Sequence, residues 1–223
     1  MDKDTILKLL TILNTMLNAN DEKLDVIMVG GANMCAVQMG RVSTHDIDTY
    51  CTQKETLYVY RDKIKNMMEI SEDWLNAGAD LYMTPQIIEE SLVFKSFSNL
   101  TVRTPTDEAM LALKVTAARD EKLFHDVDDA AFLLKKLGIN DVESIKKIVD
   151  RYKPKWWDKF GYAESFCKKA LSKAWDEHSE VISNPPQKKT LSFEERMEKA
   201  KRQVAEQKKD KSAPGKNKDH NDR

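Results

Sequence analysis

The 223-residue sequence has little cysteine and no long apolar segment. Its three cysteines, Cys35, Cys51 and Cys167, are widely scattered and show no CxxC or Cys/His spacing, so we do not expect a structural zinc site. Free thiols are typical of a reducing compartment. No run reaches the roughly 20 apolar residues that a membrane span requires, and the N-terminal segment lacks the apolar core of a signal peptide. The sequence therefore predicts a cytoplasmic protein without a membrane partner.

The sequence also lacks a large charge of one sign, since its formal net charge is -1. The charge is unevenly distributed. From Ser183 onward there are 12 Lys/Arg and 7 Asp/Glu, whereas the rest of the chain has 24 and 30. An acidic body does not indicate a protein that coats nucleic acid electrostatically. The basic tail is typical of a solvated, disordered segment, with a contact to RNA as the alternative.

The order of predicted elements indicates an α+β fold. A helix is expected over about 4–19, and another from Gly31 to about Met39 with Gly40 as its stop. Short strands extend to Arg103, and the chain is helical thereafter. A sheet in the first half and helices in the second argue against a repeating βαβ fold. We expect a core over 1–104, a helical segment over 105–182 packed on it, and a flexible charged tail over 183–223.

The most informative segment begins at Val29 and reads VGGANMCAVQMGRVSTHDIDTY. Gly30 and Gly31 follow an apolar run, and a glycine turn lets the backbone approach a phosphate. Asp46 and Asp48 are two residues apart, so on a strand both carboxylates face one side. Two neighbouring carboxylates repel each other unless a cation lies between them, and hard divalent ions prefer oxygen ligands. Either feature alone is more often a plain turn or a solvated strand edge, but together they predict a Mg²⁺ site beside a phosphate turn.

A second segment begins at Pro105 and reads PTDEAMLALKVTAARDEKLFHDVDDAAFLLKKLGI. Apolar residues at three- and four-residue spacing predict a helix, with Thr106 or Asp107 as its N-cap. Lys114 lies on this helix, and Asp126 begins the next one. A lysine is a suitable point charge for a triphosphate, and an aspartate nearby can orient a substrate hydroxyl or the lysine. Taken alone, these charges would indicate only the solvated face of an amphipathic helix.

The order of these features resembles the signature of the DNA polymerase β-type nucleotidyltransferase superfamily: GG, a short helix, then RVSTHDID. More narrowly, the sequence resembles small bacterial nucleotidyltransferase-like proteins related to the AbiEii-type toxins. The resemblance implies a small mixed β-sheet flanked by helices and followed by a helical C-terminal segment. It implies transfer of a nucleoside monophosphate from an NTP to a hydroxyl acceptor, with Mg²⁺ or Mn²⁺ as cofactor. It also suggests a tRNA or protein acceptor and an antitoxin-like partner, in a toxin–antitoxin or phage-defence setting.

The same resemblance assigns roles to individual residues. It implies two catalytic metal ligands, Asp46 and Asp48. It implies further catalytic residues in the helical half of the chain, Lys114 and Asp126. Nucleotide-binding residues are expected at four positions, namely Gly30, Gly31, Thr44 and Arg119.

The sequence departs from the superfamily pattern at the third carboxylate. These enzymes usually carry it on a strand beside the DxD pair, but the strands expected over about 92–97 and 100–103 contain no acid. Either Asp126 supplies this carboxylate from the helical part, or the metal site is incomplete. An incomplete site would indicate a catalytically degenerate nucleotidyltransferase fold that acts as a nucleotide-binding or protein-interaction module.

An aromatic segment over 153–181 gives a further alternative. Its rings are interleaved with lysines, a pattern that suits base stacking but is more often the packing of a terminal helix onto a domain. A narrow apolar stripe that begins at Phe193 predicts a marginal helix able to fold on a partner. The alternative hypothesis is an interaction protein that binds its partner through the aromatic segment and this C-terminal helix.

Overall fold

The computed structural model describes residues 1–118, 125–159 and 161–175 and shows a five-stranded mixed sheet. The strands are β1 (Leu24–Met28), β2 (Ile47–Tyr50), β3 (Leu75–Asn76), β4 (Leu92–Ser96) and β5 (Leu100–Thr104), in the spatial order β3-β2-β1-β5-β4. Strand β1 is parallel to β5 and antiparallel to β2. Strand β1 therefore lies in the middle of the sheet.

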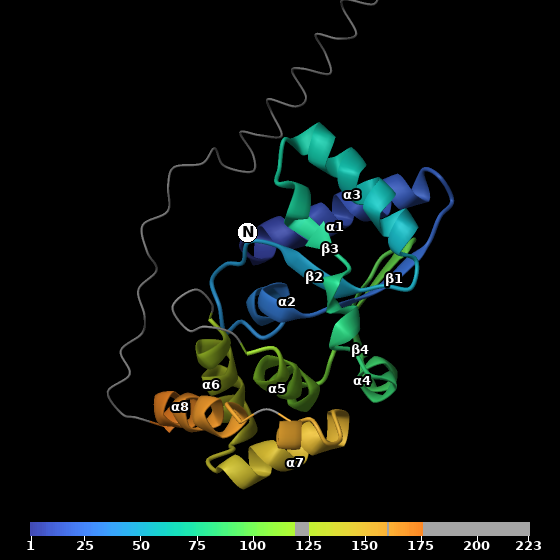
Figure 1. Ribbon diagram of the computed structural model, residues 1–223. Coiled ribbons are helices and arrows are strands. Elements are labelled where there is room, and N and C mark those ends of the chain that lie inside the picture. Colours follow the sequence, from blue (N-terminus) through green and yellow to red (C-terminus); the bar gives the residue numbers. More distant parts are fainter. Residues whose placement is uncertain (119–124, 160, 176–223) are drawn as a thin grey trace, which may run out of the picture.

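Helices α1 (Lys3–Asn18) and α3 (Lys54–Met68) pack against one face of the sheet (Figure 1). Helix α1 begins at a capped turn, where the Asp2 side chain accepts a hydrogen bond from the backbone N–H of Thr5 at 2.8 Å. Five of its apolar residues recur at helical spacing and are buried: Ile6, Leu9, Leu10, Leu13 and Leu17. They form one core cluster with Val26 and Met28 of β1.

The helices of the second half cover the other face of the sheet. Ile27 lies between Val26 and Met28 in β1, so it faces the opposite side and belongs to a second core cluster. That cluster contains the buried faces of α5 (Asp107–Thr116), α6 (Asp126–Leu137), α7 (Val142–Tyr152) and α8 (Ala163–Trp175). These four helices lie together below the sheet in Figure 1. The middle strand thus contributes to both cores.

Shorter elements connect the strands. Helix α2 (Gly30–Ala36) follows β1, and α4 (Pro85–Glu90) precedes β4. Three 3₁₀ turns span Glu72–Trp74, Gly78–Leu81 and Trp157–Lys159. Within the described parts of the chain, no helix is both long enough and apolar enough to cross a membrane.

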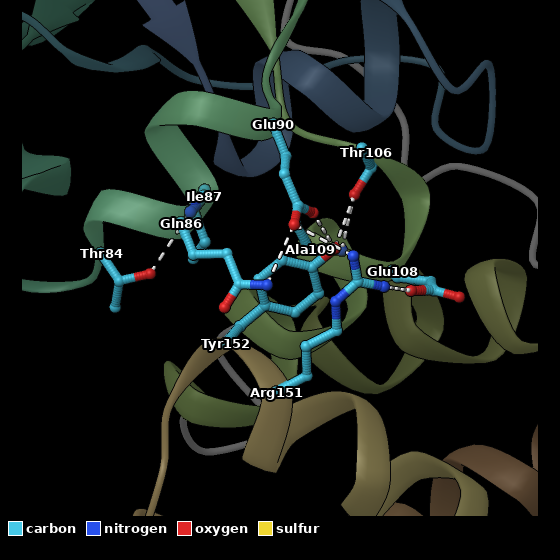
Figure 2. A network of polar contacts seen from close by, with 9 residues as sticks. All are labelled: Thr84, Gln86, Ile87, Glu90, Thr106, Glu108, Ala109, Arg151 and Tyr152. Atoms are coloured by element: carbon cyan, nitrogen blue, oxygen red, sulfur yellow. Dashed lines mark hydrogen bonds and ion pairs between the residues drawn. The ribbon is translucent and has the colours of Figure 1, made fainter.

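Polar side chains tie α7 to α4 and α5, as Figure 2 shows. The Glu90 carboxylate accepts three hydrogen bonds, from Gln86 at 2.9 Å, Tyr152 at 2.8 Å and Arg151 at 3.0 Å. Arg151 also pairs with Glu108 of α5 at 2.8 Å. The Gln86 and Tyr152 hydrogen bonds lower the pKa of Glu90, so the carboxylate stays ionised to a lower pH than an ordinary glutamate. The network fixes the C-terminal end of α7 against α4.

The structure confirms the predicted α+β class and the small mixed sheet with flanking helices. It corrects the end of the second helix. Helix α2 ends at Ala36 and not at about Met39, and Met39 itself adopts a left-handed conformation with a φ of 60°. Gly40 instead lies against α6, where an added Cβ would be 2.7 Å from the Phe132 ring. Close packing, not helix termination, explains this glycine.

Gly138 allows a test of backbone strain alone. It ends α6 with a φ of 69°, and an added Cβ would have no heavy atom within 4 Å. We expect Gly138→Ala to lower the free energy of unfolding by about 1 kcal/mol, because an L side chain disfavours this conformation. Gly161→Ala is the matched control, since its Cβ would also be uncrowded and its φ is not positive. Urea denaturation followed by circular dichroism measures both, and equal losses would contradict the strain argument.

Candidate functional site

A pocket of about 250 Å³ lies where the sheet meets α5 and α6. Its walls come from the ends of β1 and β2, the 3₁₀ turn Gly78–Leu81, α5 and the start of α6. Four residues singled out in the sequence line it together: Gly30, Asp48, Lys114 and Asp126. The fold thus brings together two motifs that are far apart in the sequence.

Gly30 forms the turn between β1 and α2 at the pocket wall. Its φ of 61° lies in the left-handed region, which side chains other than glycine rarely adopt. A Cβ at this position would lie 2.7 Å from Oδ2 of Asp48. The backbone N–H of Val29 donates to the carbonyl oxygen of Asp48 at 2.9 Å, which holds the two segments together. Glycine therefore lets the backbone approach the Asp48 carboxylate directly.

The two predicted metal ligands differ in their placement. Strand β2 begins at Ile47, where pairing with Leu75 of β3 starts, so Asp46 precedes the strand and only Asp48 lies within it. Ile47 is fully buried, and both carboxylates are partly buried. Asp48 lines the pocket, and its carboxylate forms no hydrogen bond or ion pair with any described residue, whereas Asp46 is not part of the lining. The expectation of two acids within one strand is thus correct for Asp48 alone.

The chain offers few ligands for a metal ion at this place. Over the ranges that the structure describes, no group of three or more His, Cys, Asp or Glu side chains is arranged to hold one. Mg²⁺, however, is usually held by one or two carboxylates together with waters and substrate phosphates. The Asp48 carboxylate, beside the glycine turn and without a partner among the described residues, suits this mode of binding. A role for Asp46 as a second ligand of Mg²⁺ or Mn²⁺ stays a prediction, because Asp46 does not line the pocket.

Lys114 is held by two carboxylates of α6. Its Nζ lies 2.6 Å from Oδ2 of Asp129 and 3.2 Å from Oδ1 of Asp126. Arg41, in the loop before β2, lies 3.5 Å from the same Asp129 oxygen. The side chains of Lys114, Asp126 and Asp129 are 7%, 4% and 2% exposed. Buried charges of this kind persist only when they are paired, so the two cations and two carboxylates form one balanced network.

The other predicted nucleotide-binding residues do not line the pocket. A Cβ on Gly31 would collide with Oγ1 of Thr44, so this glycine permits the close packing of α2 on the loop before β2. Thr44 is buried, and its backbone N–H donates to the carbonyl oxygen of Met1 at 2.8 Å. Arg119 lies outside the described residues. A nucleotide-binding role for these three residues stays a prediction.

The structure adds residues that sequence reasoning did not assign to the site. Asp129 follows Asp126 by three residues, so the two share one face of α6, and this spacing was a usable signal. Tyr82, which follows the turn Gly78–Leu81, also lines the pocket. No motif in the sequence had indicated a role for this residue. Strand β5 contains no acidic residue. The two carboxylates that line the pocket are those of Asp48 and Asp126.

Comparisons of the chain with models of protein families, with curated proteins and with solved structures found no match. A function is therefore inferred from the pocket residues and from the resemblance of the sequence motifs.

Removal of Lys114 would leave the buried carboxylates of Asp126 and Asp129 with Arg41 as the remaining cation of the network. We expect Lys114→Met to lower the free energy of unfolding by about 3–5 kcal/mol, the usual loss when one partner of a buried ion pair is removed. Lys136→Met is the matched control. Lys136 pairs with Asp107 at 2.7 Å but is 45% exposed, so its loss should cost less than about 1 kcal/mol. Chemical denaturation of both variants tests this, and equal losses would contradict a buried network.

Proposed function

We propose that this protein is a metal-dependent nucleotidyltransferase. In the reaction, a hydroxyl of the acceptor attacks the α-phosphorus of an NTP, the Pα–O–Pβ bond breaks, and pyrophosphate leaves. The observation that carries the proposal is the pocket itself, because Gly30, Asp48, Lys114 and Asp126 line it from segments far apart in the sequence. These four are among the eight residues to which the resemblance assigned a role.

Each pocket residue has a role that its surroundings support. Gly30 has no side chain, so a phosphate can approach the turn and the Asp48 carboxylate together. Asp48, with Asp46, would hold Mg²⁺ or Mn²⁺, which when bound neutralises the charge of the phosphates. Lys114 supplies a fixed positive charge, and Asp126, 3.2 Å from its Nζ, orients it. The acceptor's hydroxyl proton passes to a pocket carboxylate, for which Asp126 is our candidate.

The acceptor and the biological setting follow from the resemblance alone. We propose a tRNA or another RNA, or a protein, as acceptor, and an antitoxin-like protein as partner in a toxin–antitoxin or defence system. A cytoplasmic location belongs to the same proposal. The acidic body of the chain argues for an acceptor that is recognised locally and not by a broad positive surface.

A second candidate is a nucleotide-binding protein without transferase activity. Two observations favour it. Lys114 is already engaged by Asp126 and Asp129, which competes with its binding to phosphates. Strand β5 also lacks the third carboxylate of the resembled superfamily. Such a protein would bind an NTP in a metal-dependent way but would not turn it over.

A transfer assay tests the proposal. The purified full chain is incubated with each α-³²P-labelled NTP, Mg²⁺ or Mn²⁺, total RNA and cell lysate. We expect label on RNA or protein with the wild type, and a loss of roughly 100-fold or more in Asp48→Asn, because charge neutralisation is worth several kcal/mol. Asp73→Asn, an exposed acid outside the pocket, is the matched control and should retain activity.

The outcomes separate the candidates. Metal-dependent NTP binding without transfer would favour the binding protein. The absence of any NTP binding by the folded chain would contradict both candidates.

A further inference from the structure

The pocket has an apolar part that the proposed chemistry does not use. Besides its polar residues, five apolar or aromatic residues line it: Val29, Ala79, Tyr82, Leu113 and Ala117. A nucleotide likewise has a polar part and an apolar part, because its charged phosphates are attached through the ribose to a flat, largely apolar base. If the polar residues bind the phosphates, the apolar part of the pocket is left for the base.

Tyr82 is the aromatic residue among these lining residues. The residue is 39% exposed, so solvent reaches it at the pocket wall. Its backbone is fixed, since the N–H of Tyr82 donates to the carbonyl oxygen of Ala79 at 2.9 Å. The adjacent Leu81 is 91% exposed, whereas Ala79 of the same turn is buried, so the turn is anchored at Ala79 and exposed at its end. A held backbone with an accessible ring is the arrangement that a stacking platform requires.

Lys153 lies over the ring of Tyr82, with its Nζ 5.0 Å from the ring centroid. It follows α7 directly, and the contacts of Tyr152 and Arg151 with Glu90 (Figure 2) fix the end of that helix. Lys153 forms no ion pair with any described residue, and burial lowers its pKa to about 8. At neutral pH it is therefore a mostly charged, partly buried cation whose described partner is an aromatic ring.

We propose that Tyr82, held in place by Lys153, is the platform on which the base of the bound nucleotide stacks. This inference rests on the proposed function, because it takes the polar part of the pocket as the phosphate site. Stacking on one ring tolerates every base, but a purine presents a larger π surface than a pyrimidine. The platform therefore makes ATP and GTP the preferred nucleotides.

Calorimetric titration of the full chain with three probes tests the platform: ATP, UTP and inorganic tripolyphosphate, each with Mg²⁺. Tripolyphosphate reports on the polar part of the pocket alone, because it has no base. We expect Tyr82→Ala to weaken ATP binding roughly tenfold or more and to leave tripolyphosphate binding unchanged. Tyr82→Phe should bind ATP within about twofold of the wild type, since it keeps the ring. Lys153→Met should weaken ATP binding by about threefold.

Tyr162→Ala is the control, because Tyr162 is 45% exposed but does not line the pocket, and it should bind ATP as the wild type does. Unchanged ATP binding in Tyr82→Ala would overturn the platform and leave the nucleotidyltransferase proposal standing. A parallel loss of tripolyphosphate binding would also overturn it, by showing that Tyr82 acts through the shape of the pocket. A wild type that binds none of the three probes would overturn both proposals.

Discussion

A buried network of four charges connects the halves of this molecule through Arg41. Lys114 comes from α5, Asp126 and Asp129 come from α6, and Arg41 reaches Asp129 from the loop before β2. Because all four charges lie at or near the interior, each depends on the others for its electrostatic balance. Through Arg41 the network ties the helical half to the loop that precedes β2, the strand that carries Asp48. The pocket lies between these two parts of the molecule.

The pocket also contains features that do not serve stability. Among the described residues, the partly buried carboxylate of Asp48 has no ion-pair partner to offset its lost hydration. Burial lowers the pKa of Lys153, and the partner of its ammonium group within the described parts of the chain is the Tyr82 ring. Gly30 has a positive φ, a backbone conformation that residues with a side chain rarely adopt. Uncompensated groups gathered around one pocket are typical of a binding site, where a ligand supplies the missing partners.

Much of the site could be predicted from the sequence, because Gly30, Asp48, Lys114 and Asp126 each stand in a local pattern with a chemical meaning. The contact of Tyr82 with Lys153 could not, because no local pattern links a turn to the end of a distant helix. The helix predicted to reach about Met39 ends at Ala36. Gly40 was interpreted as its stop because the contact of this glycine with Phe132 of α6 cannot be seen in the local sequence. The α+β class was predictable from the order of periodic segments, whereas the strand order depends on long-range pairing.

The most direct test of the central claim is a crystal structure of the chain with Mn²⁺ and a non-hydrolysable ATP analogue. Anomalous scattering locates Mn²⁺ without reference to the protein coordinates. The proposed site predicts an anomalous peak at the Asp48 carboxylate, with the triphosphate beside Gly30 and the base against Tyr82. A nucleotide bound elsewhere, or one bound in the pocket with Mn²⁺ remote from Asp48, would contradict it.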